Sequence, residues 1–170
     1  MTRILGAYAT RSGSTRQVAE VVAETLRAPD REPELLEAAQ VRALQGYDAV
    51  ILGAPLYMYR WHKDALRFLD RFKGALARRP YALFALGPTH EPHDEAEWQA
   101  SWEQLHKALA NYDWLNPVSI ELFGGKFDPE DLGRILKMLA GSEPATDIRD
   151  WDAIRAWAAQ VGGQLDAGSV

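Results

Sequence analysis

The stretch ILGAYATRSGSTRQVAEVV, residues 4–22, decides the fold, because an apolar run of strand length turns into a helical pattern across a short polar loop. Residues 4–9 are almost all apolar, which indicates a strand buried on both faces. From Val18 onward, apolar side chains recur at the spacing of one helix face. The loop between them holds four hydroxyls and one glycine, namely Thr10, Ser12, Gly13, Ser14 and Thr15.

The same strand-then-helix unit repeats along the rest of the chain. Further strand-like runs are ELLEA, AVILGA, YALFALG and VSIELFGG, which cover residues 34–38, 49–54, 81–87 and 118–125. Segments with helical spacing of apolar residues follow or separate them. Alternation of this kind is typical of a parallel sheet covered by helices on both faces. The sequence therefore predicts a single α/β domain over residues 1–170.

Composition narrows the functional classes. The chain of 170 residues has no cysteine, which excludes disulfides, thiolate catalysis and cysteine-ligated metal sites. Its net charge is −5, with basic residues scattered among acids, so nucleic acid is not expected as a partner. No apolar run is long enough to span a bilayer, and a transmembrane segment is not expected. A cytoplasmic protein is the default expectation.

Residues 126–149 break the regular alternation. Gly, Pro and Asp recur throughout this stretch, and a helical pattern is present only over residues 132–139. We expect an irregular surface excursion between the fifth strand and the last helix.

The loop at residues 10–15 suits a phosphate group. Ligands of open parallel sheets bind beyond the carboxyl ends of the strands, and a turn of backbone N–H groups at a helix N-terminus favours an anion. A purely structural alternative is that Ser14 caps the helix, which accounts for one of the four hydroxyls. The loop lacks the glycines and lysine of nucleoside-triphosphate sites and the three-glycine dinucleotide motif, so a monophosphate is expected.

The hexapeptide TRSGST, residues 10–15, has the form [ST]-x-[ST]-G-x-[ST] and resembles the phosphate loop of flavodoxins. Residues 8–26, 47–72 and 147–158 resemble flavodoxin-domain proteins related to menaquinone-dependent protoporphyrinogen dehydrogenase. The resemblance implies a three-layer, doubly wound sheet of five parallel strands in the order 2-1-3-4-5, with FMN as the cofactor and electron transfer through the flavin. It assigns the phosphate to Thr10, Arg11, Ser12, Gly13, Ser14 and Thr15.

By the same resemblance, the loop after the third strand flanks the isoalloxazine ring. Its residues are Pro55, Leu56, Tyr57, Met58, Tyr59, Arg60 and Trp61. Aromatic side chains suit a flat ligand, although the same residues would also suit packing on neighbouring helices. Relatives often have glycine where this chain has Tyr59, and glycine eases a backbone change that stabilises one-electron-reduced flavin. Tyr59 therefore favours either two-electron chemistry or a differently shaped contact between the Met58–Tyr59 peptide and the flavin N5.

The loop after the fourth strand is implied to approach the pyrimidine end of the ring through Gly87, Pro88, Thr89 and His90. His90 is a weak candidate for a general acid or base, because its unperturbed pKa suits that role. The nearby His93, Asp94 and Glu97 also suggest a metal site by composition. No further well-spaced histidine follows, so no metal is expected.

Three functions are compatible with these residues. The first is an FMN-dependent oxidoreductase acting on a small organic, quinone or porphyrinogen-type substrate, in the last case like protoporphyrinogen dehydrogenase, with the chemistry carried by the flavin. Residues 126–149 lack the basic, aromatic-rich insertion associated with that enzyme, which leaves the substrate open. The second is an electron shuttle that docks to larger redox partners through its acidic surface. The third is a cofactor-free binding module with the same fold.

Overall fold

Five parallel strands form the central sheet of the computed structural model, which describes residues 1–167. They are β1 (Thr2–Tyr8), β2 (Arg31–Glu37), β3 (Ala49–Tyr57), β5 (Tyr81–Leu86) and β6 (Ser119–Phe123). Their order across the sheet is β2-β1-β3-β5-β6, and a two-residue strand, β4 (Arg60–Trp61), pairs antiparallel with the end of β3. With β4 set aside this is the order 2-1-3-4-5, so the predicted fold is confirmed.

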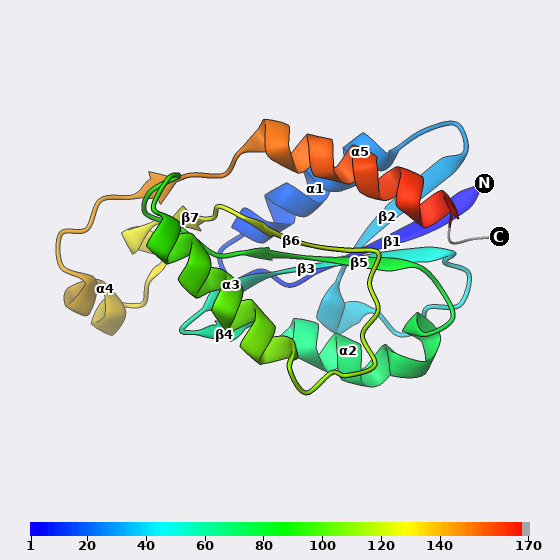
Figure 1. Ribbon diagram of the computed structural model, residues 1–170. Coiled ribbons are helices and arrows are strands. Elements are labelled where there is room, and N and C mark those ends of the chain that lie inside the picture. The colour runs from blue at the N-terminus through cyan, green and yellow to red at the C-terminus, as the bar shows by residue number, and fades with distance from the viewer. Residues whose placement is uncertain (168–170) are drawn as a thin grey trace.

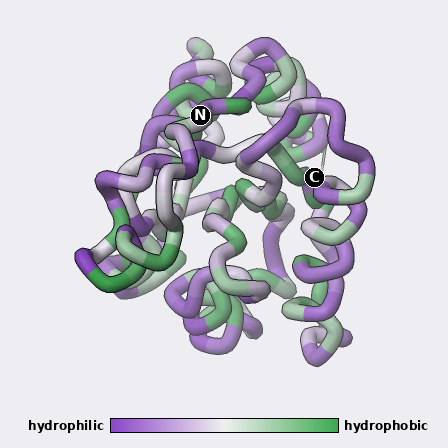
Figure 2. Tube along the Cα trace, turned by 90° about the vertical axis from the view of Figure 1, so that its left-hand side faces the viewer, coloured by the Kyte–Doolittle hydropathy of each residue, from purple (hydrophilic) through white to green (hydrophobic). Residues whose placement is uncertain are grey.

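Two helices cover each face of the sheet (Figure 1). On one face lie α1 (Ser14–Leu26) and α5 (Trp151–Ala167), and on the other α2 (Lys63–Leu76) and α3 (Glu95–Leu109). Hydrophobic and hydrophilic residues alternate along these helices, as amphipathic helices require (Figure 2). The apolar side chains form one hydrophobic cluster on each side of the sheet. Within residues 1–167, no helix is long and apolar enough to cross a bilayer.

Strand β2 begins earlier than its apolar residues suggest. The sequence predicts a strand over residues 34–38, whereas β2 starts at Arg31 and runs through Pro33. In the order of strands, β2 lies at the edge of the sheet, and its neighbour there is β1. An edge strand tolerates proline because one of its sides needs no N–H donors. A short 3-10 helix, η1 (Ala38–Gln40), follows it.

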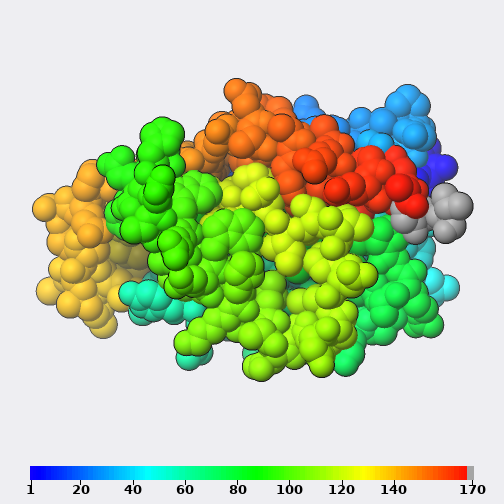
Figure 3. All heavy atoms as spheres, viewed as in Figure 1, coloured from blue at the N-terminus to red at the C-terminus, as the bar shows by residue number. Residues whose placement is uncertain are grey.

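The segment 126–149 contains several short elements at the carboxyl end of the sheet. Strand β7 (Lys126–Phe127) pairs antiparallel with β8 (Thr146–Asp147), and between them lie the 3-10 helix η2 (Pro129–Asp131) and helix α4 (Arg134–Ala140). Helix α4 forms one extremity of the molecule (Figure 3). It overlaps residues 132–139, where the sequence shows a helical pattern, but starts two residues later and ends one residue later, and its Ile135, Met138 and Leu139 are exposed.

Candidate functional site

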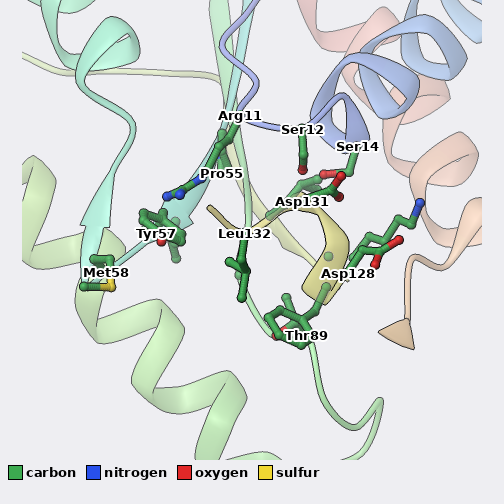
Figure 4. Close-up of a pocket in the computed structure, with 16 residues that line it drawn as sticks. Arg11, Ser12, Ser14, Pro55, Tyr57, Met58, Thr89, Asp128, Asp131 and Leu132 are labelled. Atoms are coloured by element: carbon green, nitrogen blue, oxygen red, sulfur yellow. The ribbon is translucent and has the colours of Figure 1, made fainter. Parts of the chain in front are cut away.

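Loops that follow β1, β3, β5 and β6 surround a hollow of about 250 Å³ at the carboxyl end of the sheet (Figure 4). Because parallel strands end at the same edge, residues far apart in the sequence meet there. Nine residues assigned to the cofactor from the sequence line this hollow, namely Arg11, Ser12, Ser14, Pro55, Leu56, Tyr57, Met58, Gly87 and Thr89. The hollow therefore joins all three predicted loops.

The backbone of the first loop leaves the start of α1 open to an anion. Gly13 is the N-cap residue, with φ of 95°, a left-handed conformation that disfavours residues with a Cβ. Its N–H donates to Thr10 Oγ1 at 2.9 Å. No side chain caps α1, and its first turn contains no acidic residue, whereas His62 caps α2 and Asp94 caps α3. Ser14 is thus not the cap, and the amides of the first turn are available to a phosphate.

Thr15 provides the sharpest test of whether a phosphate fits. Its side chain is completely buried, and among residues 1–167 its Oγ1 has no hydrogen-bond partner. An unpaired buried hydroxyl costs about 1–3 kcal/mol, so such groups usually have a partner. A phosphate oxygen at the start of α1 would supply that partner. The residues of the loop therefore fit the phosphate of FMN.

The second loop is a tight hairpin turn with an unusual backbone. Leu56 pairs with Trp61 and Tyr57 with Arg60, which leaves Met58 and Tyr59 as the two turn residues. Their φ angles are 49° and 64°. Such turns favour asparagine and glycine, because both positions are left-handed. The strain is held at the edge of the hollow, where such strain is commonly functional.

Replacing Tyr59 with glycine is expected to stabilise the protein. A left-handed conformation costs a residue with a Cβ about 1–2 kcal/mol, and Tyr59 has little packing to lose because it is 80% exposed. Tyr59→Gly should therefore raise the free energy of unfolding by about 1 kcal/mol, measured by urea denaturation. Tyr59→Ala is the matched control, because it keeps the Cβ and should gain nothing. Equal effects of glycine and alanine would contradict the strain argument.

Trp61 and Arg60 do not lie where the sequence predicted flavin contacts. Trp61 is 1% exposed, belongs to the hydrophobic cluster on the α2 and α3 side, and donates from its Nε1 to the Ala54 carbonyl oxygen at 2.9 Å. Trp61 therefore fixes the hairpin to the hydrophobic core and does not line the hollow. Arg60 is exposed in β4 and also lies outside the lining. Of the aromatic residues in this loop, Trp61 therefore packs in the core, and the tyrosines lie at the edge of the hollow.

Arg11 connects the first two loops. Its guanidinium carbon lies 3.6 Å from the centre of the Tyr57 ring, and both residues line the hollow. A cation over an aromatic face is attracted by the negative potential of that face. Arg11 therefore brings a positive charge to the side of the hollow where the hairpin meets the phosphate loop.

Glu97 of α3 holds the third loop in place. Its Oε1 accepts hydrogen bonds from the Thr89 N–H at 2.8 Å and the His90 N–H at 3.4 Å, and it lies 3.1 Å from His90 Nδ1. Burial raises the pKa of the Glu97 carboxyl, but these hydrogen bonds outweigh burial, and the pKa is lowered overall. Glu97 is therefore ionised at neutral pH.

The remaining predicted residues lie beside the hollow rather than in its lining. Tyr59 and His90 border a neighbouring hollow on the other side of the hairpin, while Thr10, Gly13, Thr15 and Pro88 line neither of the two hollows. His90, Asp94 and Glu97 border the same neighbouring hollow. No group of three metal-ligating side chains gathers in the described part of the chain.

Residues 125–132 were not predicted as part of the site. Gly125, Lys126, Phe127, Asp128, Asp131 and Leu132 all line the hollow, together with Leu86. Figure 4 shows Leu132 and Asp131 between the phosphate loop and the loop at Thr89. The glycine pair at the end of β6 was an available signal, because it continues the pattern of strand ends that carry ligand-binding loops.

Arg149 fastens the end of this segment to the phosphate loop. Its side chain is 5% exposed and donates to both oxygens of Asp147, to the Ser14 carbonyl oxygen at 3.2 Å and to Gln17 Oε1 at 2.7 Å. The guanidinium also lies over the Trp151 ring. The segment that lines the hollow and the start of α1 are thus held together by one arginine.

The Arg149–Asp147 pair predicts a pH-dependent contribution to stability. The hydrogen bond from Arg149 lowers the pKa of Asp147, so the contribution is complete above the unfolded pKa of about 3.9 and is lost as the pH falls through the folded pKa. Asp147→Asn should lower the free energy of unfolding at pH 6 by less than about 1 kcal/mol, because Asp147 is partly exposed to solvent. The difference from the wild type should shrink at pH 3, as measured by urea denaturation. Glu143→Gln, an exposed carboxylate in the same segment, is the control, and an equal effect there would refute the assignment.

Solved structures similar to this one are flavodoxins and a flavodoxin-type protein. Oxidised Flavodoxin 2 from Bacillus cereus is 24% identical with a TM-score of 0.59, covering 96% of this chain and 99% of that chain. A flavodoxin from the domain Archaea is 12% identical with a TM-score of 0.59, covering 97% and 99%. A WrbA-like flavodoxin from Agrobacterium tumefaciens is 16% identical with a TM-score of 0.56, covering 99% of both chains.

Sequence comparison gives the family. A comparison with curated proteins finds no significant match. The family model described as Flavodoxin domain matches residues 5–139, which is most of the chain and includes every residue that lines the cofactor hollow. The chain therefore belongs to the flavodoxin domain family, whose members bind FMN and transfer electrons to redox partners.

Proposed function

We propose that the protein is an FMN-dependent oxidoreductase that exchanges electrons with a small organic molecule beside the cofactor hollow. The observation that carries this proposal is a second hollow, of about 520 Å³, on the other side of the β3–β4 turn. It shares Leu56, Tyr57, Met58 and Gly87 with the cofactor hollow. A small molecule there would be separated from the flavin only by these shared residues.

Different residues of this chain would bind the cofactor, shield its ring and exchange protons with the substrate. The first loop and the start of α1 hold the phosphate, and Tyr57 and Met58 form a wall beside the ring. The bound flavin supplies the electron transfer. His90 is the candidate for proton exchange with the substrate, because it borders the second hollow and its Nδ1 lies 3.1 Å from Glu97 Oε1.

The first test is the visible spectrum of the purified protein. Absorption in the flavin bands, with release of FMN and not FAD on denaturation, supports the cofactor assignment. The FMN-loaded protein, reduced under anaerobic conditions, should then be reoxidised by quinones at rates that saturate with quinone concentration. A protein that holds FMN but reacts with quinones without saturation contradicts the proposed enzymatic role.

A second candidate function is electron delivery to a larger protein. The net charge of −5 and the exposed apolar side chains of α4, at the cofactor end of the molecule, favour it. Potentiometry separates the two functions. Two well-separated one-electron steps support the shuttle, and a single two-electron step supports the enzyme.

A further inference from the structure

The second hollow is distinct from the phosphate site. It lies between the β3–β4 turn and α3, and no residue of the loop at 10–15 lines it. Ser101 of α3 forms part of its lining and is only 6% exposed. A serine hydroxyl can donate one hydrogen bond and accept two, so a ligand in this hollow can form a hydrogen bond with Ser101.

Ser101 lies close to the boundary between the two hollows. A Cβ placed on Gly87 would be 3.1 Å from Ser101 Oγ, and Gly87 lines both hollows. The hydroxyl therefore faces the part of the second hollow that is nearest to the cofactor. A ligand that forms a hydrogen bond with Ser101 would therefore lie next to Gly87, one of the residues that separate the second hollow from the cofactor hollow.

The lining of the second hollow is mainly acidic in its charged side chains. Asp94 and Glu97 border it together with His90, and no lysine or arginine of residues 1–167 does. The pKa of Glu97 is lowered, as described above, so this carboxylate is charged at neutral pH. Its second oxygen, Oε2, is buried and has no partner among the described residues. Negative potential in a partly enclosed site attracts cations and repels anions.

The opposite wall offers aromatic and thioether surface. Tyr57, Met58 and Tyr59 project along the turn, and Tyr59 is 80% exposed in its left-handed conformation. Tyrosine rings favour stacked or edge-on contacts with another ring, and methionine adapts to flat surfaces. The wall therefore suits a planar molecule.

We propose that the second hollow binds the organic molecule that exchanges electrons with FMN, and that it selects planar rings without negative charge. This inference rests on the proposed function and adds the class of substrate. Neutral quinones and aromatic cations can stack on the aromatic wall and form a hydrogen bond with Ser101. They carry no negative charge that the two carboxylates would repel. Rings that carry carboxylates or phosphates, tetrapyrrole carboxylates among them, are disfavoured.

The test is a binding measurement with two planar three-ring probes of opposite charge. Proflavine is a cation and anthraquinone-2-sulfonate is an anion. Each is titrated into the oxidised, FMN-loaded protein, in which the first hollow is filled, and binding is followed by amide NMR shifts. We expect proflavine to shift signals of residues 57–60, 87 and 94–104, with an affinity at least about tenfold above that of the anion. Equal affinities, or shifts confined to other residues, would overturn the proposal.

Conservative variants assign the selectivity to the two carboxylates. Asp94→Asn keeps the N-cap of α3, because asparagine caps as well as aspartate, and should weaken proflavine binding about threefold. Asp94→Asn with Glu97→Gln should remove most of the preference for the cation. Glu95→Gln is the matched control, since Glu95 is exposed in the same turn and does not border the hollow. An effect of Glu95→Gln as large as that of the double variant would assign the preference to net charge and refute the site.

Binding and turnover can fail separately in this design. A protein that binds proflavine at these residues but shows no saturable quinone reduction contradicts the proposed enzymatic role and retains the charge-selective site. A protein that turns over quinones but binds both probes equally refutes the selectivity alone.

Discussion

Ser12→Asp is expected to abolish the retention of FMN. Ser12 is exposed at the lining of the cofactor hollow, so aspartate adds a negative charge where the phosphate is assigned. Unit charges at about 4 Å repel by about 4 kcal/mol at the effective dielectric constant near a protein surface, and every 1.4 kcal/mol is about tenfold in affinity. The dissociation constant for FMN should therefore rise by at least about a hundredfold, as measured by quenching of flavin fluorescence.

The matched control for this prediction is Ser12→Asn. Asparagine has nearly the shape of aspartate without its charge, so it should retain FMN within about tenfold of the wild type. Neither variant should change the unfolding of the cofactor-free protein by more than about 0.5 kcal/mol, because the position is on the surface. Gly13→Asp would also place a charge in the loop, but Gly13 has φ of 95°, and strain would be mixed with repulsion. Equal loss of FMN in the aspartate and asparagine variants would show that charge is not the cause.

Most of the fold could be predicted because buried strands and amphipathic helices leave simple patterns. The strands β1, β3 and β5 are buried in the middle of the sheet, so their apolar runs are continuous. The limits of β2 were less clear, because this edge strand is half exposed and contains Pro33. The first and last residues of such a strand depend on its position at the edge of the sheet and on its pairing with a distant strand. Neither can be seen in the local sequence.

The site was predictable where a local motif acts through its own backbone. The hexapeptide at 10–15 needs only the strand before it and the helix after it, and its four hydroxyl side chains gave a clear signal. The sequence assigned Trp61 to the flavin, whereas its side chain is buried beneath the turn, because an exposed aromatic residue and a buried one look alike in sequence. The contribution of Asp131 and Leu132 depends on how residues 126–149 fold back over the sheet. That path is fixed by Arg149 and by the pairing of β7 with β8, which are long-range contacts.

Thr15→Val is expected to change cofactor binding and stability in opposite directions. Valine has the shape of threonine with a methyl group in place of the hydroxyl. The Thr15 Oγ1 is buried without a partner in the cofactor-free protein, so its removal should raise the free energy of unfolding by about 1–3 kcal/mol. With FMN present, the same change removes a hydrogen bond to a charged phosphate, which is worth about 1.5–3 kcal/mol, or at least about tenfold in affinity.

Opposite signs distinguish a binding residue from a structural one, because a residue that only supports the fold would lose stability and cofactor together. Urea denaturation of the cofactor-free protein and fluorescence titration with FMN measure the two effects separately. Thr15→Ser is the control, since it keeps the hydroxyl and removes one buried methyl group. It should bind FMN nearly as the wild type does and lose about 1 kcal/mol of stability. If Thr15→Val bound FMN with unchanged affinity, the buried hydroxyl would not contact the phosphate, and the assignment of Thr15 to the site would be wrong.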